Sequence, residues 1–375
     1  MDQQENNYRR ARQTSAQQAN NAATYSRDGY ATSQRRAPQP RTSRSSRRTT
    51  PKSSLPPWAP LVAAVVVIAL LVFIVTRFVS CESTQESSNQ ANNASQAATL
   101  TAQDTQASAN QAESAQNTQA QLADLDWDTI QANLETVVPE ETAQTLAEKG
   151  HTDEDVAWIC QNYEELALDG PEVQLKLLKL AAADPTAVHY VRHFAEEYPH
   201  DEGTGFTETF TAGTVPRMYQ WDERWGYTIY SSTAFGLTGC GPTAFAMVYA
   251  GLTGNNDMTP YDFSIMAREN GYEATYTGTN SGFYEFASAQ YGFSCQTISI
   301  TEDALADALD SGHVVICNAG YGTFSSYGGH FFVITKLNGD GTLSINDPYS
   351  EVRSDTDWDV DLVLSQTKAL YSFGL

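Results

Sequence analysis

The sequence is poor in cysteine and in basic residues. Five cysteines among 375 residues are too few, and too scattered, for a disulfide scaffold. Lysine and arginine number 22 against 45 aspartates and glutamates, and the formal net charge is −23. Such an acidic chain repels phosphate backbones, which excludes nucleic acid as a partner of its main body. Apolar residues make up 41% and aromatic residues 11% of the chain, so a wholly disordered protein is excluded as well.

The charge is divided unevenly along the chain. Residues 1–57 carry eleven Lys and Arg against three Asp and Glu, a net charge of +8, whereas residues 78–375 carry ten against forty-two, a net charge of −32. The two ends are therefore expected to lie in different environments. The first 57 residues are rich in Arg, Ser, Thr, Gln and Pro. They bury too little apolar surface to fold, which predicts a disordered basic tail.

A long apolar run separates these two parts. Residues 61–75 (LVAAVVVIALLVFIV) contain no polar side chain, and together with their neighbours they are long enough to span the hydrocarbon core of a bilayer. We predict a single transmembrane helix at 58–80. Because the basic tail precedes it, the positive-inside rule places the tail in the cytoplasm and the acidic bulk outside the cell membrane. A cleaved signal peptide is disfavoured by the long hydrophilic leader, and Arg77-Phe78-Val79-Ser80 is a poor approach to a lipidated Cys81.

Two further segments precede the last domain. Residues 81–122 consist mainly of Gln, Ala, Ser, Asn and Thr without apolar periodicity, which predicts a low-complexity stalk. Residues 123–203 contain several helix-start signals in succession and are expected to form a small helical region. His189 and His193 have the spacing of a zinc pair on one helix face. No third ligand completes the pair, so we predict a solvated face and no metal site.

Residues 204–375 carry the chemistry. Cys240 stands in the motif Gly-Cys-Gly-Pro-Thr, where the glycines allow a tight turn and close approach of a substrate backbone. Pro242 favours the first turn of a helix, and a helix N-terminus favours thiolate over thiol. We therefore predict a nucleophile at Cys240. The default interpretation of a cysteine, a buried structural residue, applies to Cys160, Cys295 and Cys317, and the sequence leaves open whether the last two form a disulfide.

A nucleophilic thiolate needs a base, and residues 204–375 contain two histidines. His313 lies in a predicted helix-to-strand turn with no acid in its pattern. His330 follows two glycines and opens an apolar strand at 331–334. We therefore predict that His330 is the base.

The hairpin that follows His330 indicates which residue orients its imidazole. An Asn-Gly-Asp-Gly turn at 338–341 joins two predicted strands. Symmetric closure of this turn pairs Leu337 with Thr342, and opposed residues share a face. Asp347 then lies on the face of His330, one diagonal step away, and we predict that it orients the imidazole. A β-bulge would invert this parity, and the alternative role of Asp347 is to start a turn.

These residues predict a cysteine peptidase. Cys240 attacks an amide carbonyl, His330 carries the proton to the leaving amine, and Asp347 holds the imidazole tautomer. The oxyanion needs donors, for which the backbone N–H of Cys240 and the side-chain amide of Gln220 are the candidates. The alternative for Gln220 is a polar group on a strand before a loop. The thiolate chemistry calls for no metal and no cofactor, and we predict none.

Four motifs together resemble a known family. They look like those of stand-alone relatives of the bacteriocin-processing (double-glycine leader) cysteine peptidases, a peptidase C39-like domain of the papain superfamily. The resemblance covers about 204–375 and implies an α+β, papain-like fold in which a Cys-bearing helix packs on an antiparallel sheet that carries His and Asp. The motifs are QWDERWGY (220–227), LTGCGPTAFAMVYAGLTG (237–254), YGGHFFVITK (327–336) and INDPYSE (345–351).

By resemblance, four residues take the catalytic places of this family. Cys240 is the nucleophile and His330 the base, while Asp347 orients the base and Gln220 supplies the oxyanion donor. Gly278-Thr279-Asn280 falls where relatives often read Gly-Thr-Ser or Gly-Thr-Asn, and it is expected to cap a helix beside the cleft. The leader-peptide substrate of transporter-fused members is not carried over, because the sequence shows no transporter or nucleotide-binding segment. Their cytosolic placement also disagrees with the predicted topology.

The expected function is that of a membrane-anchored, extracytoplasmic cysteine peptidase of a bacterium, acting on a peptide or protein substrate. One alternative keeps the fold and cuts cell-wall peptides as an amidase or endopeptidase, although other wall-cutting thiol enzymes often pair Cys with two histidines. The other alternative is a catalytically silent module that binds peptides. The sequence leaves open the natural substrate, the oligomeric state and the role of the 123–203 helices.

Overall fold

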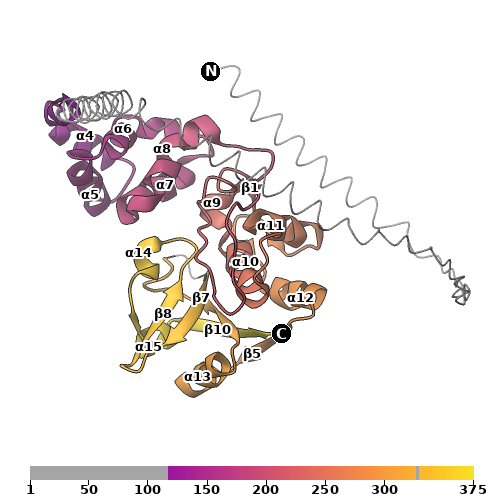
Figure 1. Ribbon diagram of the computed structural model, residues 1–375. Coiled ribbons are helices and arrows are strands. Elements are labelled where there is room, and N and C mark those ends of the chain that lie inside the picture. Colours follow the sequence, from indigo (N-terminus) through magenta and orange to yellow (C-terminus); the bar gives the residue numbers. More distant parts are fainter. Residues whose placement is uncertain (1–116, 327–328) are drawn as a thin grey trace, which may run out of the picture. The chain divides into compact units, whose positions relative to one another are not determined.

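The computed structural model describes residues 117–326 and 329–375 (Figure 1). The predicted basic tail at 1–57 and the predicted transmembrane helix at 58–80 lie outside these residues. Most of the predicted stalk lies outside them too, and its described part, 117–122, is helical. Within the two described ranges, the structure contains no helix with the length and apolar composition that a membrane crossing requires.

The helical region predicted at 123–203 is present. Asp126 caps the first of its helices and Pro171 opens a later one at Gly170, which are standard signals for a helix start. The elements are α4 (Trp127–Leu134), α5 (Glu140–Gly150), α6 (Glu154–Gln161), the 3-10 helix η1 (Tyr163–Ala167), α7 (Pro171–Ala183), the 3-10 helix η2 (Pro185–Ala187) and α8 (Val188–Glu197).

The core of the helical region continues past residue 203. Trp221, Tyr227 and Ala234 are buried in the same apolar cluster as the inward-facing residues of α4 to α8. The Tyr190 ring on α8 stacks on Tyr227 with ring centroids 4.7 Å apart, and the Tyr190 hydroxyl donates to the Gly226 carbonyl at 3.1 Å. The helices are therefore packed directly against the segment that leads to Cys240.

A six-stranded antiparallel sheet forms the centre of the C-terminal part, in the order β5-β10-β6-β7-β8-β9. Two short hairpins, β1 with β2 and β3 with β4, lie outside this sheet. The strands are β1 (Ile229–Tyr230), β2 (Thr233–Ala234), β3 (Glu273–Ala274), β4 (Gly278–Thr279), β5 (Ser294–Ile298), β6 (Val314–Ala319), β7 (His330–Leu337), β8 (Thr342–Asn346), β9 (Trp358–Asp359) and β10 (Thr367–Gly374).

Both faces of the sheet are buried. On β6, Val314 and Ile316 belong to the cluster of the Cys240-bearing helix, while Val315 and Cys317 belong to a second cluster on the opposite face. This double burial explains why β6 is apolar without alternation. The helices of this part are α9 (Phe235–Thr238), α10 (Cys240–Thr253), α11 (Pro260–Glu269), α12 (Gly282–Tyr291), α13 (Glu302–Asp310), α14 (Glu351–Ser354) and α15 (Val360–Ser365).

The α+β prediction is confirmed by this arrangement. Figure 1 shows α10 beside the sheet, with β7 next to it. Residues from α10, β6 and β7 form one cluster that includes Phe245, Ile316 and Val333. Almost every side chain of α10 is buried, so the position of its first residue, Cys240, is fixed by the packing of the whole helix.

The register of the β7–β8 hairpin differs from the symmetric closure that the sequence predicts. Leu337 pairs with Leu343 and not with Thr342, because the turn contains one more residue than expected. A register shift between Ile334 and Lys336 then compensates for the longer turn. Beyond this bulge, Val333 pairs with Asn346 as symmetric closure requires. The two irregularities cancel, and the predicted parity at the Asp347 end of the hairpin is retained.

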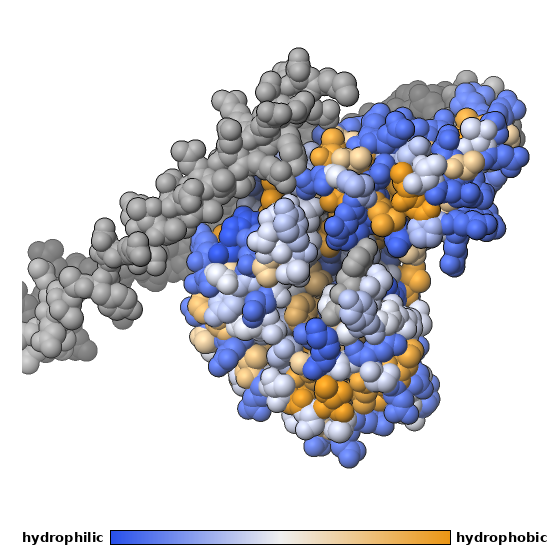
Figure 2. Space-filling model, turned by 180° about the vertical axis from the view of Figure 1, so that it is seen from behind, coloured by the Kyte–Doolittle hydropathy of each residue, from blue (hydrophilic) through white to orange (hydrophobic). Residues whose placement is uncertain are grey.

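Hydrophilic residues cover most of the face shown in Figure 2, and apolar residues gather in patches in its upper and its lower part. Two loop tyrosines are unusually exposed: Tyr321 at 75% and Tyr276 at 68%. Tyr276 also has a positive φ of 61°, which a bulky side chain rarely adopts. Single exposed apolar residues are common in folded proteins, but this backbone conformation is not.

Candidate active site

Cys240 is the first residue of α10 and is partly buried. This is the helix N-terminus that the sequence predicts, where backbone N–H groups and the helix dipole favour negative charge. The next residue, Gly241, lies against the β3–β4 hairpin. A Cβ atom at Gly241 would meet the Thr279 side chain at 2.6 Å, so the close approach of Thr279 to the first turn requires glycine.

His330 and Asp347 meet where two neighbouring strands, β7 and β8, begin and end beside the start of α10. His330 is the first residue of β7, and Asp347 follows the last residue of β8. The His330 Nε2 atom lies 2.7 Å from Asp347 Oδ1, and Asp347 has no exposed surface. Since Nε2 is engaged, Nδ1 is the ring nitrogen that is left for Cys240, which lies close enough to His330 to affect the pKa of the imidazole. The structure thus brings together the three residues that the sequence singles out.

The electrostatics of this group favour a charged His330–Asp347 pair. Burial lowers the pKa of His330, but the charge and hydrogen bond of Asp347 and the interaction with Cys240 outweigh burial and raise it to about 9. Burial raises the pKa of Asp347, but His330, Arg353 and the Tyr349 N–H together lower it below its usual value. The imidazole is therefore held protonated at neutral pH next to a carboxylate.

Arg353 is part of this site and was missed by the sequence analysis. Its Nη1 atom lies 3.2 Å from Asp347 Oδ2 and donates to the Phe324 carbonyl at 3.2 Å. The Tyr349 N–H donates to Asp347 Oδ1 at 2.8 Å. Arg353 is the nearest basic residue in the sequence to Asp347, but only the short helix α14 turns its guanidinium back onto the carboxylate.

Gln220 is buried near the same group of residues. Its Nε2 donates to the Gly236 carbonyl at 2.9 Å, and its backbone N–H donates to the Pro348 carbonyl at 2.7 Å. Gly236 lies four residues before Cys240, and Pro348 follows Asp347. One amide hydrogen of Gln220 is thus used for anchoring, and the second is the one that an oxyanion would need. Its Oε1 finds no hydrogen-bond partner among the described residues.

The other cysteines of the described residues, Cys160, Cys295 and Cys317, lie elsewhere in the fold and are free thiols. Cys295 and Cys317 therefore form no disulfide, which settles the question that the sequence leaves open. Burial raises the pKa of Cys160 and Cys317 to about 12. Burial also raises the pKa of Cys295. These thiols are therefore held in the neutral form, as expected for structural cysteines.

Three further histidines that are candidates from the sequence, His313, His189 and His193, contact residues outside the Cys240–His330–Asp347 group. His313 Nδ1 lies 2.8 Å from the Ser372 hydroxyl, on the strand that pairs with β6. The His189 and His193 rings lie 4.4 Å apart on α8, and each contacts a glutamate, Glu223 and Glu196 respectively. Residues 117–326 and 329–375 contain no group of three metal-ligating side chains.

Gly278-Thr279-Asn280 ends one residue before the N-cap of α12, Ser281, which makes no side-chain cap bond itself. Asn280 Oδ1 accepts a hydrogen bond from the Gly282 N–H at 2.9 Å, at the start of α12. The Thr279 hydroxyl lies 2.7 Å from the Tyr230 hydroxyl, which ties the β3–β4 hairpin to the β1–β2 hairpin. The segment therefore both starts α12 and supports the first turn of α10.

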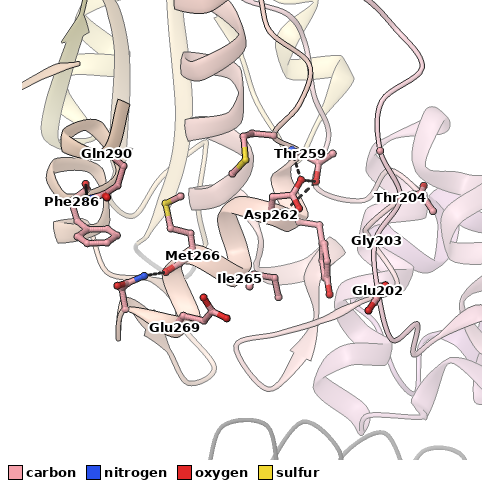
Figure 3. A pocket seen from close by; sticks show the side chains of 14 residues that line it. Glu202, Gly203, Thr204, Thr259, Asp262, Ile265, Met266, Glu269, Phe286 and Gln290 are labelled. Atoms are coloured by element: carbon pink, nitrogen blue, oxygen red, sulfur yellow. Dashed lines mark hydrogen bonds between the residues drawn. The ribbon is translucent and has the colours of Figure 1, made fainter. Parts of the chain in front are cut away.

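A separate groove of about 810 Å³ lies between α11 and the segment 202–205 (Figure 3). Figure 3 shows the Thr259 and Asp262 side chains bonded to each other, as the capping box that starts α11. Met266 and Glu269 of α11 also line the groove. None of the four predicted catalytic residues lines it.

Residues 213–372 match the model of the Peptidase_C39 like family. The crystal structure of a protein from Bacillus anthracis assigned as a C39-like peptidase is similar, with 14% sequence identity and a TM-score of 0.31, and the match covers 45% of this chain and 98% of that chain. None of the curated proteins matches the chain significantly.

Proposed function

We propose that this protein is a cysteine peptidase that hydrolyses peptide bonds with Cys240, His330 and Asp347. The match of residues 213–372 to the Peptidase_C39 like family supports this proposal. The observation that carries the proposal is the buried His330–Asp347 hydrogen bond beside Cys240, which begins α10 and interacts with the imidazole. A thiol, an imidazole and a carboxylate in this order are the groups that nucleophilic amide hydrolysis needs. The substrate class is a peptide or protein.

The proposed reaction begins with attack of the Cys240 sulfur on the amide carbonyl carbon. A C–S bond forms and the carbonyl π electrons move to oxygen, which gives a tetrahedral oxyanion. Its collapse breaks the C–N bond, and the protonated His330 donates its proton to the leaving amine. Water then attacks the thioester, His330 takes a proton from the water, and the carboxylic acid leaves from sulfur. Asp347 holds the imidazole orientation throughout.

The oxyanion is proposed to be held by two donors. The Cys240 backbone N–H lies at the start of α10, and the second amide hydrogen of Gln220 is the other candidate. Donors aimed at a developing negative charge are usually a large contribution to catalysis. Gln220 is well suited, because its bond to Gly236 and its backbone bond to Pro348 fix it between the segments that carry Cys240 and Asp347.

The proposed location is the outer side of a bacterial cell membrane. The apolar run at 61–75 and the basic tail before it support a single-pass anchor at 58–80 with the peptidase domain outside the cytoplasm. The described part of the chain is acidic throughout, which favours peptide over nucleic acid as the substrate.

Selective alkylation tests the proposed nucleophile. The full-length chain in detergent micelles is treated with iodoacetamide at pH 6, and modification of each cysteine is followed by mass spectrometry. Cys240 should react at least tenfold faster than Cys295, a partly buried free thiol of the same domain that serves as the matched control. Equal rates for the two cysteines would contradict the assignment and favour a silent peptide-binding module.

A further inference from the structure

The short helix α14 lies between the helical region and the candidate active site. It spans Glu351–Ser354, and its third residue, Arg353, pairs with Asp347. A single helical turn is marginal by itself, because its first N–H groups have no partner within the helix. The contacts at the two ends of α14 therefore decide where Arg353 lies.

The N-terminal end of α14 is held by a residue of the helical region. Asp184 Oδ2 accepts hydrogen bonds from the Glu351 N–H at 2.6 Å and the Val352 N–H at 3.4 Å. Asp184 is only 1% exposed, and its Oδ1 accepts from the Thr186 N–H and hydroxyl at the start of η2. One buried carboxylate thus caps η2 and also binds the first two N–H groups of α14, whose N-cap residue, Ser350, accepts from the Arg353 N–H at 3.2 Å.

The other end of α14 is fastened to Asp347. The Asp347 N–H donates to the Ser354 hydroxyl at 2.9 Å, and Arg353 reaches the Asp347 carboxylate. Arg217 adds a bond from its Nη2 to the Ser354 carbonyl at 2.7 Å. A series of direct contacts therefore leads from Asp184 through α14 to the carboxylate that orients His330.

We propose that Asp184 is a positioning residue of the candidate active site, which holds Arg353 against Asp347 by binding the first two N–H groups of α14. The inference rests on the proposed function and adds to it a role for the helical region. These helices are part of the catalytic unit, because one of their side chains determines the surroundings of the orienting carboxylate.

The charged groups around Asp184, α14 and Asp347 determine whether loss of Asp184 raises or lowers the pKa of Asp347. Asp347 faces His330 on β7, Arg353 on α14 and the Cys317 thiol on β6. Asp184 faces Tyr219 and Glu351. Without Asp184, Arg353 moves away and Asp347 keeps its burial but loses a cation, so its pKa rises. Asp347 then takes up a proton at a higher pH than in the wild type. At acidic pH it is neutral and no longer supplies the negative charge that pairs with His330.

The test measures the alkylation rate of Cys240 by iodoacetamide in the full-length chain at pH 4.5 and at pH 7.5. Asp184→Ala should lower the rate at pH 4.5 about tenfold, the equivalent of one pKa unit, and change the rate at pH 7.5 less than twofold. Arg353→Met should do the same. The double variant should match Arg353→Met within twofold, because Asp184 acts through Arg353.

The matched control is Asp153→Ala. Asp153 caps α6 within the helical region by accepting from the Val156 N–H at 3.0 Å. Its loss should lower the melting temperature, as cap removal does, but leave the ratio of the two Cys240 rates unchanged. If Asp184→Ala and Asp153→Ala give the same ratio, or if the double variant shows additive effects, the positioning role is wrong.

A second variant removes one hydrogen bond between Asp184 and α14 by a change in α14. Glu351→Pro removes the N–H that Asp184 accepts, and proline is tolerated at the first position of a helix. It should lower the alkylation rate of Cys240 at pH 4.5 about threefold, because Asp184 still binds the Val352 N–H. An unchanged rate would contradict the proposal, even if Asp184→Ala does not fold. Failure of the proposed function is seen separately, as a wild-type Cys240 that reacts no faster than Cys295.

Discussion

The Nε2 atom of His330 lies 2.7 Å from Oδ1 of Asp347, and the carboxylate is completely buried. This contact raises the pKa of His330 to about 9 in spite of burial, so the imidazole carries a proton at neutral pH. A protonated imidazole beside a Cys240 thiolate is the ion pair from which the proposed attack begins. The proposed chemistry follows from this pair more than from any other feature of the domain.

The pair predicts a pH-dependent stability. The folded pKa of His330 lies above its ordinary value of 6.5, so its stabilisation is complete below pH 6.5 and is lost as pH rises through about 9. The free energy of unfolding should fall by about 1 to 3 kcal/mol over this window. Thermal denaturation of wild type and His330→Gln at pH 6 and pH 9 measures it. The variant should lack this decrease, and an equal decrease in both proteins would assign it to other groups.

Removal of the Asp347 charge should change the pH dependence of the site. Asp347→Asn keeps an acceptor for His330 Nε2 but loses the charge that raises the pKa of His330. The Cys240 alkylation rate at pH 7.5 should therefore fall about tenfold or more, while the rate at pH 10 stays within twofold. Asp357→Asn is the control, because its carboxylate contacts Asn338 and Ser344 at the distal end of the hairpin. A flat response of Asp347→Asn would contradict the orienting role.

Gln220→Ala tests the second oxyanion donor. Loss of one such donor typically lowers kcat by about 10² to 10³, and KM should change little, because the donor acts on the transition state. Steady-state cleavage of a peptide found by library screening separates the two constants. Gln174→Ala provides the matched control: Gln174 is also buried and also donates its amide to a backbone carbonyl, that of Tyr163 at 2.8 Å. A loss of kcat in both variants would point to destabilisation alone.

The backbone conformation of Tyr276 indicates that its substitution by glycine stabilises the protein. Its φ of 61° costs an L-residue roughly 1–2 kcal/mol, and the exposed ring recovers little of this by burial. Tyr276→Gly should therefore raise the free energy of unfolding by about 0.5–1 kcal/mol. Tyr321→Gly serves as the control, because Tyr321 is equally exposed and lies outside the positive-φ residues of the described chain. A loss of stability at Tyr276 would show that its ring makes contacts that stabilise the fold.

The residues nearest to the chemistry were predictable from short-range patterns. Cys240 was recognised from the glycines and proline that surround a helix start, and His330 from its place at the head of an apolar strand. The position of Asp347 relative to His330 followed from the period of two along a strand. That inference held because the longer turn and the bulge cancel, and the sequence has no feature that shows this cancellation.

The residues that the sequence did not reveal act over long sequence distances. Arg353 reaches Asp347 only because α14 turns back beneath it, and Asp184 binds the first N–H group of α14 from 167 positions earlier in the chain. Both depend on tertiary packing, which local propensity and spacing do not encode. The burial of Trp221 and Tyr227 among the helices of 123–203 is a contact of the same kind.

The most direct test of the central claim is cleavage of a peptide library by the full-length protein, with products identified by mass spectrometry. Wild type and Cys295→Ala should cut the same bonds at rates within twofold of each other, and Cys240→Ala should abolish cleavage. Cleavage by Cys240→Ala at the wild-type rate, or an absence of cleavage by wild type while its Cys240 reacts with iodoacetamide no faster than Cys295, would contradict the account.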